Sequence, residues 1–240
     1  MRLRSTKTPQ GPQDAVHHPV FARYYARMSV AAETTAGIAP VRAELLSGLS
    51  GRVIEVGAGN GLNFAHYPST VREVVAVEPE RTLRQLAVRS ALGAGVPVDV
   101  MPGTAEALPV GDGQFDAAVL SLVLCTVRDV RGSLAEIRRV LRPGGELRFF
   151  EHVRAGTRGM AAAQRVLDRT VWPLLAGGCH TSRDALAAIE AAGFVVESHR
   201  DIRIPETGVR LPTSACVAGV ARRPWAAEAE EEEPVRSADH

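Results

Sequence analysis

The sequence has no apolar run of about 18 residues, so no segment is predicted to span a membrane. No apolar stretch follows the charged N-terminal residues, which argues against a secretory signal. The three cysteines form no CxxC pair and no even set, which favours a reducing, cytoplasmic setting. The spacing of the cysteines relative to His152 does not suggest a set of zinc ligands, so no metal site is predicted.

The sequence also has no large excess of positive or negative charge. The formal net charge is +1, and there is no basic stripe or added recognition domain, so nucleic acid and protein are not the expected substrates. With 240 residues and 45% hydrophobic content, the chain is predicted to form one domain, over residues 20–223. Residues 1–19 are polar and proline-containing, and residues 224–240 are acidic, so both are predicted to be disordered tails.

Strand-like and helix-like segments alternate through the predicted domain. We expect strands at 52–57, 72–78, 97–101, 115–122, 145–152, 194–200 and 213–222. We expect helical structure over 20–49 and helices at 62–67, 80–93, 130–141, 159–175 and 183–192. This alternation predicts a doubly wound α/β fold, with a seven-stranded, mostly parallel sheet and helices on both faces. The last two strands lack a helix between them and are expected to form an antiparallel hairpin at one edge.

Two of these helices have readable starts. Asp129 precedes an apolar stripe and is expected to cap the helix at 130–141. Thr181 or Ser182 is expected to cap the helix at 183–192.

The first predicted strand runs into Glu55–Val56–Gly57–Ala58–Gly59–Asn60–Gly61, where three glycines stand at alternate positions. Glycine allows tight turns and close approach of the backbone to a ligand, so this is a nucleotide-type loop. A dinucleotide fingerprint would need its last glycine where Leu62 stands, which favours a nucleoside ligand without a pyrophosphate. Glu78, 21 residues after Gly57, ends the second strand and is placed to accept hydrogen bonds from ribose hydroxyls.

The glycine loop paired with Glu78 resembles the S-adenosylmethionine site of class I methyltransferases. The segments Gly103–Pro109 and Leu141–Leu147 continue this likeness in the same order. The resemblance implies S-adenosylmethionine as cofactor and a Rossmann-like methyltransferase fold. An Asp often stands in the family at the place of Thr104, so a hydroxyl or backbone contact to the adenine is implied there. The implied cofactor contacts all follow strands: Glu55, Gly57, Ala58, Gly59, Asn60, Gly61, Asn63, Glu78, Pro79, Thr104, Ala105, Glu106, Ser121, Leu122 and Val123.

The second half resembles the methyltransferase-like thiol S-methyltransferases. The similar strings are 61–68, 122–127, 150–153, 164–168 and 178–181. The resemblance implies a small-molecule thiol as methyl acceptor, in detoxification or in the tailoring of a metabolite. Because the cofactor half is shared more widely, a C- or O-methyltransferase of a quinone, phenol or lipid remains an alternative. A catalytically silent S-adenosylmethionine-binding protein is the non-enzyme alternative.

Two residues are candidates for catalysis. His152 ends the fifth strand on the ligand side of the sheet, and histidine accepts a proton near neutral pH. Asp168 is the only acidic residue between Glu151 and Asp184, and we expect it to act as base or to orient His152. The alternative is that His152 bonds to backbone and that Asp168 pairs with a neighbouring arginine.

The remaining candidates are expected at the acceptor pocket. Gln164, Asp168 and Trp172 are spaced to share one helix face that closes over the site. Tyr24 and Tyr25 form part of a lid or else belong to a helix packed on the sheet. Cys125 is either near the cofactor or an ordinary core residue. The full set of predicted substrate contacts is Tyr24, Cys125, Gln164, Trp172, Cys179 and His180.

Overall fold

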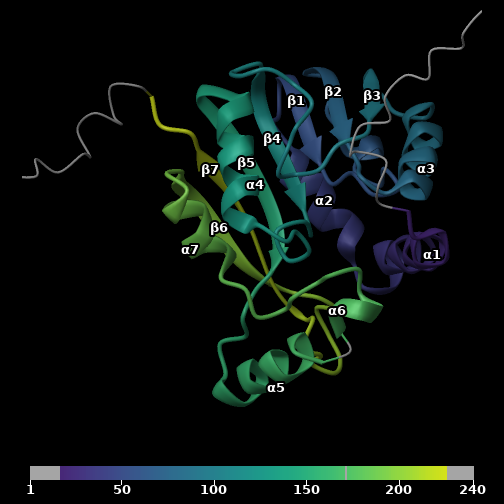
Figure 1. Cartoon of the computed structure of the whole chain (residues 1–240), viewed down its shortest axis with the longest axis vertical. Coiled ribbons are helices and arrows are strands. Elements are labelled where there is room, and N and C mark those ends of the chain that lie inside the picture. The colour runs from purple at the N-terminus through teal and green to yellow at the C-terminus, as the bar shows by residue number, and fades with distance from the viewer. Residues whose placement is uncertain (1–16, 171, 226–240) are drawn as a thin grey trace, which may run out of the picture.

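The computed structural model describes residues 17–170 and 172–225 (Figure 1). The rest of both predicted tails lies outside the described residues. At both ends the folded part extends beyond the predicted 20–223. The His18 N–H donates to Glu80 at 3.1 Å, and the indole of Trp225 packs directly on Gly144.

One seven-stranded sheet forms the centre of the molecule, in the order β3-β2-β1-β4-β5-β7-β6. Its strands are β1 (Gly51–Val56), β2 (Val71–Val77), β3 (Val98–Met101), β4 (Phe115–Ser121), β5 (Leu141–His152), β6 (Val195–Arg203) and β7 (Ala215–Arg222). The first five are parallel, and β7 pairs antiparallel with both β5 and β6. The predicted doubly wound sheet and its terminal antiparallel hairpin are therefore confirmed.

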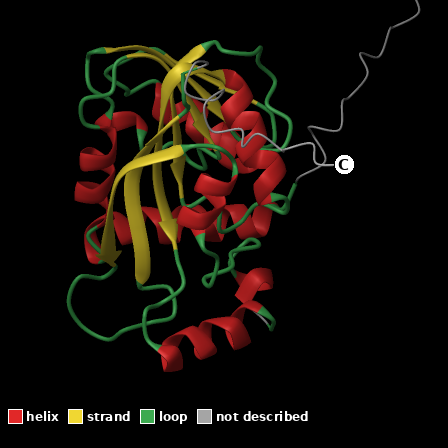
Figure 2. Ribbon diagram, turned by 90° about the vertical axis from the view of Figure 1, so that its left-hand side faces the viewer, coloured by secondary structure: helices red, strands yellow, loops and turns green. Residues whose placement is uncertain are grey.

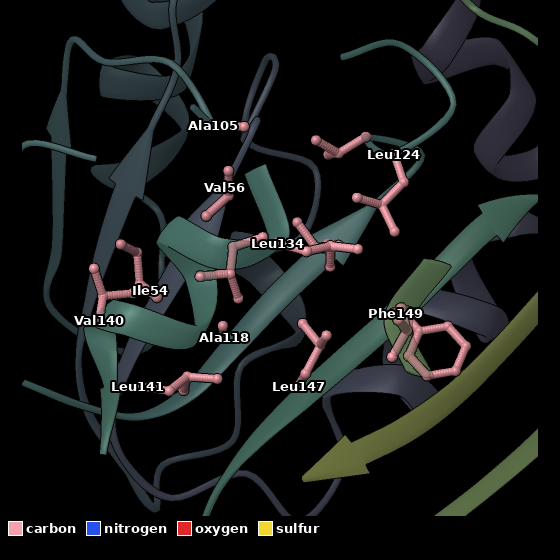
Figure 3. Close-up of a cluster of buried hydrophobic side chains, with 14 of the residues drawn as sticks. Ile54, Val56, Ala105, Ala118, Leu124, Leu134, Val140, Leu141, Leu147 and Phe149 are labelled. Carbon is pink, nitrogen blue, oxygen red and sulfur yellow. The ribbon is translucent and has the colours of Figure 1, made fainter. Parts of the chain in front are cut away.

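Helices cover both faces of this sheet (Figure 2). They are α1 (Pro19–Thr35), α2 (Ile38–Leu46), α3 (Arg81–Ala91), α4 (Val130–Val140), α5 (Arg158–Asp168), α6 (Trp172–Leu175) and α7 (Ala185–Ala191). On one face, Ile137 of α4 and Ile189 of α7 are fully buried against the sheet. Leu134 of α4 belongs to the same cluster, with Ile54 and Leu147 of the sheet (Figure 3). A second apolar cluster, with Leu46 of α2 and Phe150, fills the other face. The strands between the two clusters are apolar on both sides, as parallel central strands must be.

Two helices begin at a residue whose side chain caps the first turn. Asp129 accepts the Gly132 N–H at 2.9 Å, which confirms the predicted start of α4. The predicted cap of α7 is wrong: Asp184, not Thr181 or Ser182, accepts the Ala187 N–H at 3.1 Å.

Three predicted helices differ from the structure. The segment 20–49 is two helices, because Gly37 lies between them at φ 72°. The predicted helix at 62–67 is only a 3-10 turn, η2 (Phe64–His66). The predicted helix at 159–175 ends at Asp168, and its last part is the separate α6. In Figure 1, α5 and α6 lie below the sheet.

Candidate active site

The glycine loop follows β1 and contacts the carboxyl end of β2 and the loop after β4. Gly57 has φ 71°, and its N–H donates to the Val77 carbonyl at 2.8 Å. A Cβ on Gly57 would lie 2.7 Å from Val123 Cγ2, so no side chain fits there. The loop after β1 therefore packs directly on the loop after β4, and glycine at 57 is what permits this contact.

Glu78 lies beside this loop and is buried, with 5% of its surface exposed. Its Oε2 accepts the Gly59 N–H at 2.7 Å and its Oε1 accepts the Glu80 N–H at 2.8 Å. Burial raises the pKa of Glu78 to about 7, against the lowering effect of those two bonds. A carboxylate oxygen has two lone pairs, so each oxygen can accept one further bond. This geometry suits two adjacent hydroxyls of a ribose, and it fits the implied S-adenosylmethionine.

Glu55 and Asn63 were predicted to contact the cofactor, but their side chains bond to the protein beneath the loop. Glu55 accepts from Asn63 Nδ2 at 3.0 Å and from Tyr67 Oη at 2.7 Å. Asn63 Oδ1 accepts from Arg42 Nη1 at 2.8 Å. Burial raises the pKa of Glu55 to about 7, although Tyr67 and Arg42 favour its charged form. These side chains therefore hold the segment after the glycine loop to β1 and α2.

The sequence analysis missed Arg42, which links this network to the end of β4. It is a buried arginine on α2, and its Nη1 also donates to Ser121 Oγ at 2.8 Å. The signal was a lone arginine inside the mostly apolar segment Ile38–Leu46.

The other predicted cofactor residues lie at the same edge of the sheet. Ala58, Asn60 and Ala105 are buried, while Pro79, Thr104, Glu106 and Leu122 are partly exposed. Leu122 has φ 61°, a conformation that is rare for a side chain of this size and is typical of functional loops. Ala105 belongs to the hydrophobic core, which leaves Thr104 and Glu106 as the partly exposed side chains after β3.

Glu151, also missed, fixes the loop after β4. This fully buried carboxylate accepts the N–H groups of Val123 and Leu124, each at 2.8 Å, and that of Cys125 at 3.2 Å. Burial raises the pKa of Glu151 to about 7, while the three N–H donors act in the opposite direction. A carboxylate directly after Phe149–Phe150, inside an apolar strand, was the available signal.

Cys125, His152 and Cys179 meet at the carboxyl ends of β4 and β5. Their ligand-type side-chain atoms all lie within 4.8 Å of one another, and His152 Nδ1 is 3.6 Å from Cys179 Sγ. Both thiols are buried and His152 is partly exposed. A hydrogen bond between the two thiols lowers the pKa of Cys179 and raises that of Cys125. The fold thus assembles a sulfur–nitrogen cluster that the spacing of these residues in the sequence did not predict.

Asp168 does not orient His152. Its Oδ1 accepts from the Thr181 N–H at 2.7 Å and the Thr181 hydroxyl at 3.1 Å, and its Oδ2 accepts from the Ser182 N–H at 2.9 Å and the Ser182 hydroxyl at 2.6 Å. Burial acts to raise the pKa of Asp168, but these bonds outweigh it and the pKa is lowered. Asp168 therefore fixes the loop that carries Cys179.

Two predicted substrate residues, Gln164 and His180, make contacts with the protein backbone instead. Gln164 is fully buried, accepts the Ala155 N–H at 2.8 Å, and donates to the carbonyls of Val153, Thr181 and Pro212. His180 Nδ1 lies 2.7 Å from the carbonyl oxygen of Gly178 in its own loop. The shared face of Gln164, Asp168 and Trp172 does not exist, because the helix ends at Asp168.

Trp172 instead reaches the cluster from α6. Its buried indole N–H has no oxygen or nitrogen partner among the described residues. The interaction of this N–H with the Cys179 sulfur lowers the pKa of Cys179.

Of the two tyrosines on α1, the structure turns Tyr25 and not Tyr24 toward the site. Tyr24 is 54% exposed, whereas a Cβ on Gly59 would lie 3.8 Å from the Tyr25 ring. Burial raises the pKa of Tyr25 to about 12; the Arg42 charge opposes this, and the negative charges of Cys125, Glu78 and Cys179 add to it. Tyr25 thus lies against the glycine loop. The buried face of α1 contains Ala22 and Ala26, and Tyr25 is next to Ala26 in the sequence.

Among the helices in the described part of the chain, none is long and apolar enough to cross a membrane.

Known proteins share this fold and parts of this sequence. A family model described as "Methyltransferase domain" matches residues 54–149. The human protein "Thiol S-methyltransferase TMT1A" is 35% identical over 165 residues, which is 66% of this chain and 67% of that protein. The match thus spans about two thirds of each chain.

A second relative and a solved structure extend the comparison. The "Demethylmenaquinone methyltransferase" of Renibacterium salmoninarum is 34% identical over 96 residues, 40% of this chain and 39% of that protein. The structure of "Geranyl diphosphate methyltransferase in complex with SAM" superposes with a TM-score of 0.59 at 17% identity, covering 78% of this chain and 84% of that one.

Proposed function

Because the chain belongs to the class I S-adenosylmethionine-dependent methyltransferases, we propose that its methyl acceptor is the thiol of a small molecule. The observation that carries this proposal is the 35% identity with a thiol S-methyltransferase over 165 residues. The sulfur–nitrogen cluster at the carboxyl ends of β4 and β5 supports it from the structure.

The chemistry divides between the two halves of the site. When bound, S-adenosylmethionine supplies an electrophilic methyl group. The chain must hold the acceptor sulfur in line and as a thiolate, because the thiolate is the nucleophile. In this proposal Glu78 binds the ribose, and Gly57, Gly59 and Val123 shape the cofactor cleft.

The acceptor side of the site is the cluster of Cys125, His152 and Cys179. His152 is its partly exposed member, and we assign it a part in activating the acceptor thiol. Asp168 acts as a positioning residue, through the loop that carries Cys179.

A paired substrate panel tests this function. The purified chain is incubated with S-adenosylmethionine and a small alkyl thiol, thiophenol, phenol or a demethylated quinone, and S-adenosylhomocysteine and the methylated product are measured. We expect turnover of the thiols and little with phenol, since the pairs differ mainly in the reacting atom. Faster methylation of the quinone or of phenol would contradict the proposal and favour the C- or O-methyltransferase alternative, for which the demethylmenaquinone relative is the supporting observation. Cofactor binding without turnover of any acceptor would indicate a silent binding protein.

Two variants separate the assigned roles. His152→Ala should lower kcat for the thiol by roughly 100-fold, while the Kd for S-adenosylmethionine stays within about threefold. Asp168→Asn should act mainly on the KM for the thiol, because it loosens the loop and not the reacting group. Unchanged turnover in both variants, with unchanged cofactor binding, would refute these roles.

A further inference from the structure

Cys125, His152 and Cys179 come from three separate segments of the chain. Cys125 lies in the loop after β4, His152 is the last residue of β5, and Cys179 follows α6. The cluster lies at the edge of the sheet where Val123 contacts Gly57. Two sulfurs and one imidazole nitrogen therefore converge next to the cofactor loop.

The spacing of these atoms suits a tetrahedral ion. With Zn–S near 2.3 Å and Zn–N near 2.0 Å, tetrahedral ligands place N and S about 3.5 Å apart and two sulfurs about 3.8 Å apart. The observed distance from His152 Nδ1 to Cys179 Sγ is 3.6 Å, and no pair in the cluster exceeds 4.8 Å. Because no pair is wider than this limit, a shift on the order of 1 Å is enough to reach the tetrahedral spacing.

The surrounding hydrogen bonds hold the three ligands in place. Glu151 accepts the Cys125 N–H, and the Cys125 carbonyl accepts the His180 N–H at 2.7 Å. Asp168 fixes the two residues that follow His180. Ordered ligands of this kind reduce the conformational cost of binding an ion.

Charge balance also favours a divalent cation. Two buried thiolates would be costly without compensation, and a 2+ ion neutralises both. Thiolate and imidazole are ligands that zinc takes in proteins, and three protein ligands leave a fourth position open.

We propose that Cys125, His152 and Cys179 bind Zn²⁺ and that its open fourth position takes the acceptor thiol. This rests on the proposed function, and it specifies how the thiol is activated. As the thiol binds, its S–H bond breaks, the proton passes to solvent, and a Zn–S bond replaces the bond to water. The anionic sulfur is then the nucleophile: a new S–CH₃ bond forms to it, the sulfonium S–CH₃ bond of S-adenosylmethionine breaks, and neutral S-adenosylhomocysteine leaves. His152 contributes as a ligand.

Cobalt substitution tests the site without any turnover. The full chain is reduced, stripped with a chelator and titrated with Co²⁺ in the absence of oxygen. We expect one equivalent to produce sulfur-to-cobalt charge transfer and the intense visible bands of a four-coordinate ion, and Zn²⁺ to abolish them. Thiophenol should raise the charge-transfer intensity by roughly half, because three Co–S bonds replace two.

The third cysteine provides the matched control. Cys216 pairs with His152 across β5 and β7 and is equally buried, but its thiol is directed to the Thr213 carbonyl. Cys125→Ser and Cys179→Ser should weaken Zn²⁺ binding roughly 100-fold or more, while Cys216→Ser leaves it unchanged. S-adenosylmethionine binding by each variant reports that it is folded.

Three results would overturn the metal site: no tetrahedral cobalt spectrum, equal binding in the Cys125 and Cys179 variants, or a Cys125–Cys179 disulfide in place of binding. The activity arm separates the two proposals. Thiol methylation at the same rate in stripped and zinc-loaded protein would refute the metal and leave the proposed function standing. A cobalt site with no thiol methylation would refute the proposed function and the role of the fourth position, and leave the metal site standing.

Discussion

Glu78→Gln gives the most direct test of the cofactor site. Both oxygens of Glu78 already accept one backbone N–H each, from Gly59 and from Glu80. A glutamine keeps one acceptor oxygen and turns an NH₂ group toward the other N–H donor. The variant therefore loses a charge-assisted bond to the ribose, worth about 1.5–3 kcal/mol, or roughly 10- to 150-fold in Kd.

The pH dependence follows from the same carboxyl. Its pKa in the free protein is raised to about 7, so the protonated form dominates at pH 6 and the carboxylate at pH 8. Ribose hydroxyls donate to the carboxylate, so binding at pH 6 must first remove the proton. The Kd for S-adenosylmethionine should therefore be about 10-fold higher at pH 6 than at pH 8.

Isothermal titration calorimetry at both pH values measures this, with S-adenosylmethionine as the ligand. Other buried carboxyls also titrate in this range, so the comparison with Glu78→Gln isolates the contribution of Glu78. The variant should bind weakly with little pH dependence, and the exposed Glu190→Gln should behave as the native chain. A Kd for Glu78→Gln within about threefold of native at pH 8, or an equal pH effect in both proteins, would refute the reasoning.

Three further changes have expected outcomes. Glu55→Gln removes a buried carboxyl whose pKa is raised from 4.5 to about 7; its stabilising contribution is fully present below pH 4.5 and is lost as the pH rises through 7. In urea unfolding, the free energy of unfolding of the variant relative to the native protein should therefore rise by about 2.5 kcal/mol from pH 5 to pH 8. A difference between the two proteins that does not change with pH would contradict this. Tyr25→Ala should weaken S-adenosylmethionine binding roughly 10-fold, whereas Tyr24→Ala, on the exposed side of α1, should change it less than twofold; equal effects would reject the orientation of α1. Gln164→Ala should lower the free energy of unfolding by about 3 kcal/mol, because it leaves buried backbone groups unpaired, and a change below about 1 kcal/mol would show that its four bonds are not needed.

Local patterns in the sequence were enough to predict the sheet and the cofactor edge. Apolar runs separated by helical segments specify parallel strands, because such strands are buried on both faces. The glycines from Gly57 to Gly61 and the acidic Glu78 both follow strands, and the carboxyl ends of neighbouring parallel strands meet at one edge. The order of strands and loops was therefore enough to predict where the cofactor loop lies, although not the part of Arg42 or the protein bonds of Glu55 and Asn63.

Helix ends were harder to predict, because the competing interactions come from distant residues. The helical pattern over 159–175 continues past Asp168, but its carboxylate bonds to Thr181 and Ser182, and the helix ends there. Tyr24 and Tyr25 are adjacent and equally aromatic, and only the packing of α1 on the glycine loop distinguishes them.

The cluster on the acceptor side of the site could not be predicted from local sequence patterns, because it forms only in the tertiary structure. Cys125 and Cys179 each lie 27 residues from His152 in the sequence, so no local spacing signals their contact. They meet because β4 and β5 are neighbours in the sheet and because the loop after α6 is bonded to Cys125 and Asp168. The sequence by itself determined the fold and the position of the cofactor loop, since both follow from periodicity and glycine. The tertiary structure decided which sulfur and nitrogen atoms face one another, since that depends on the packing of separate segments.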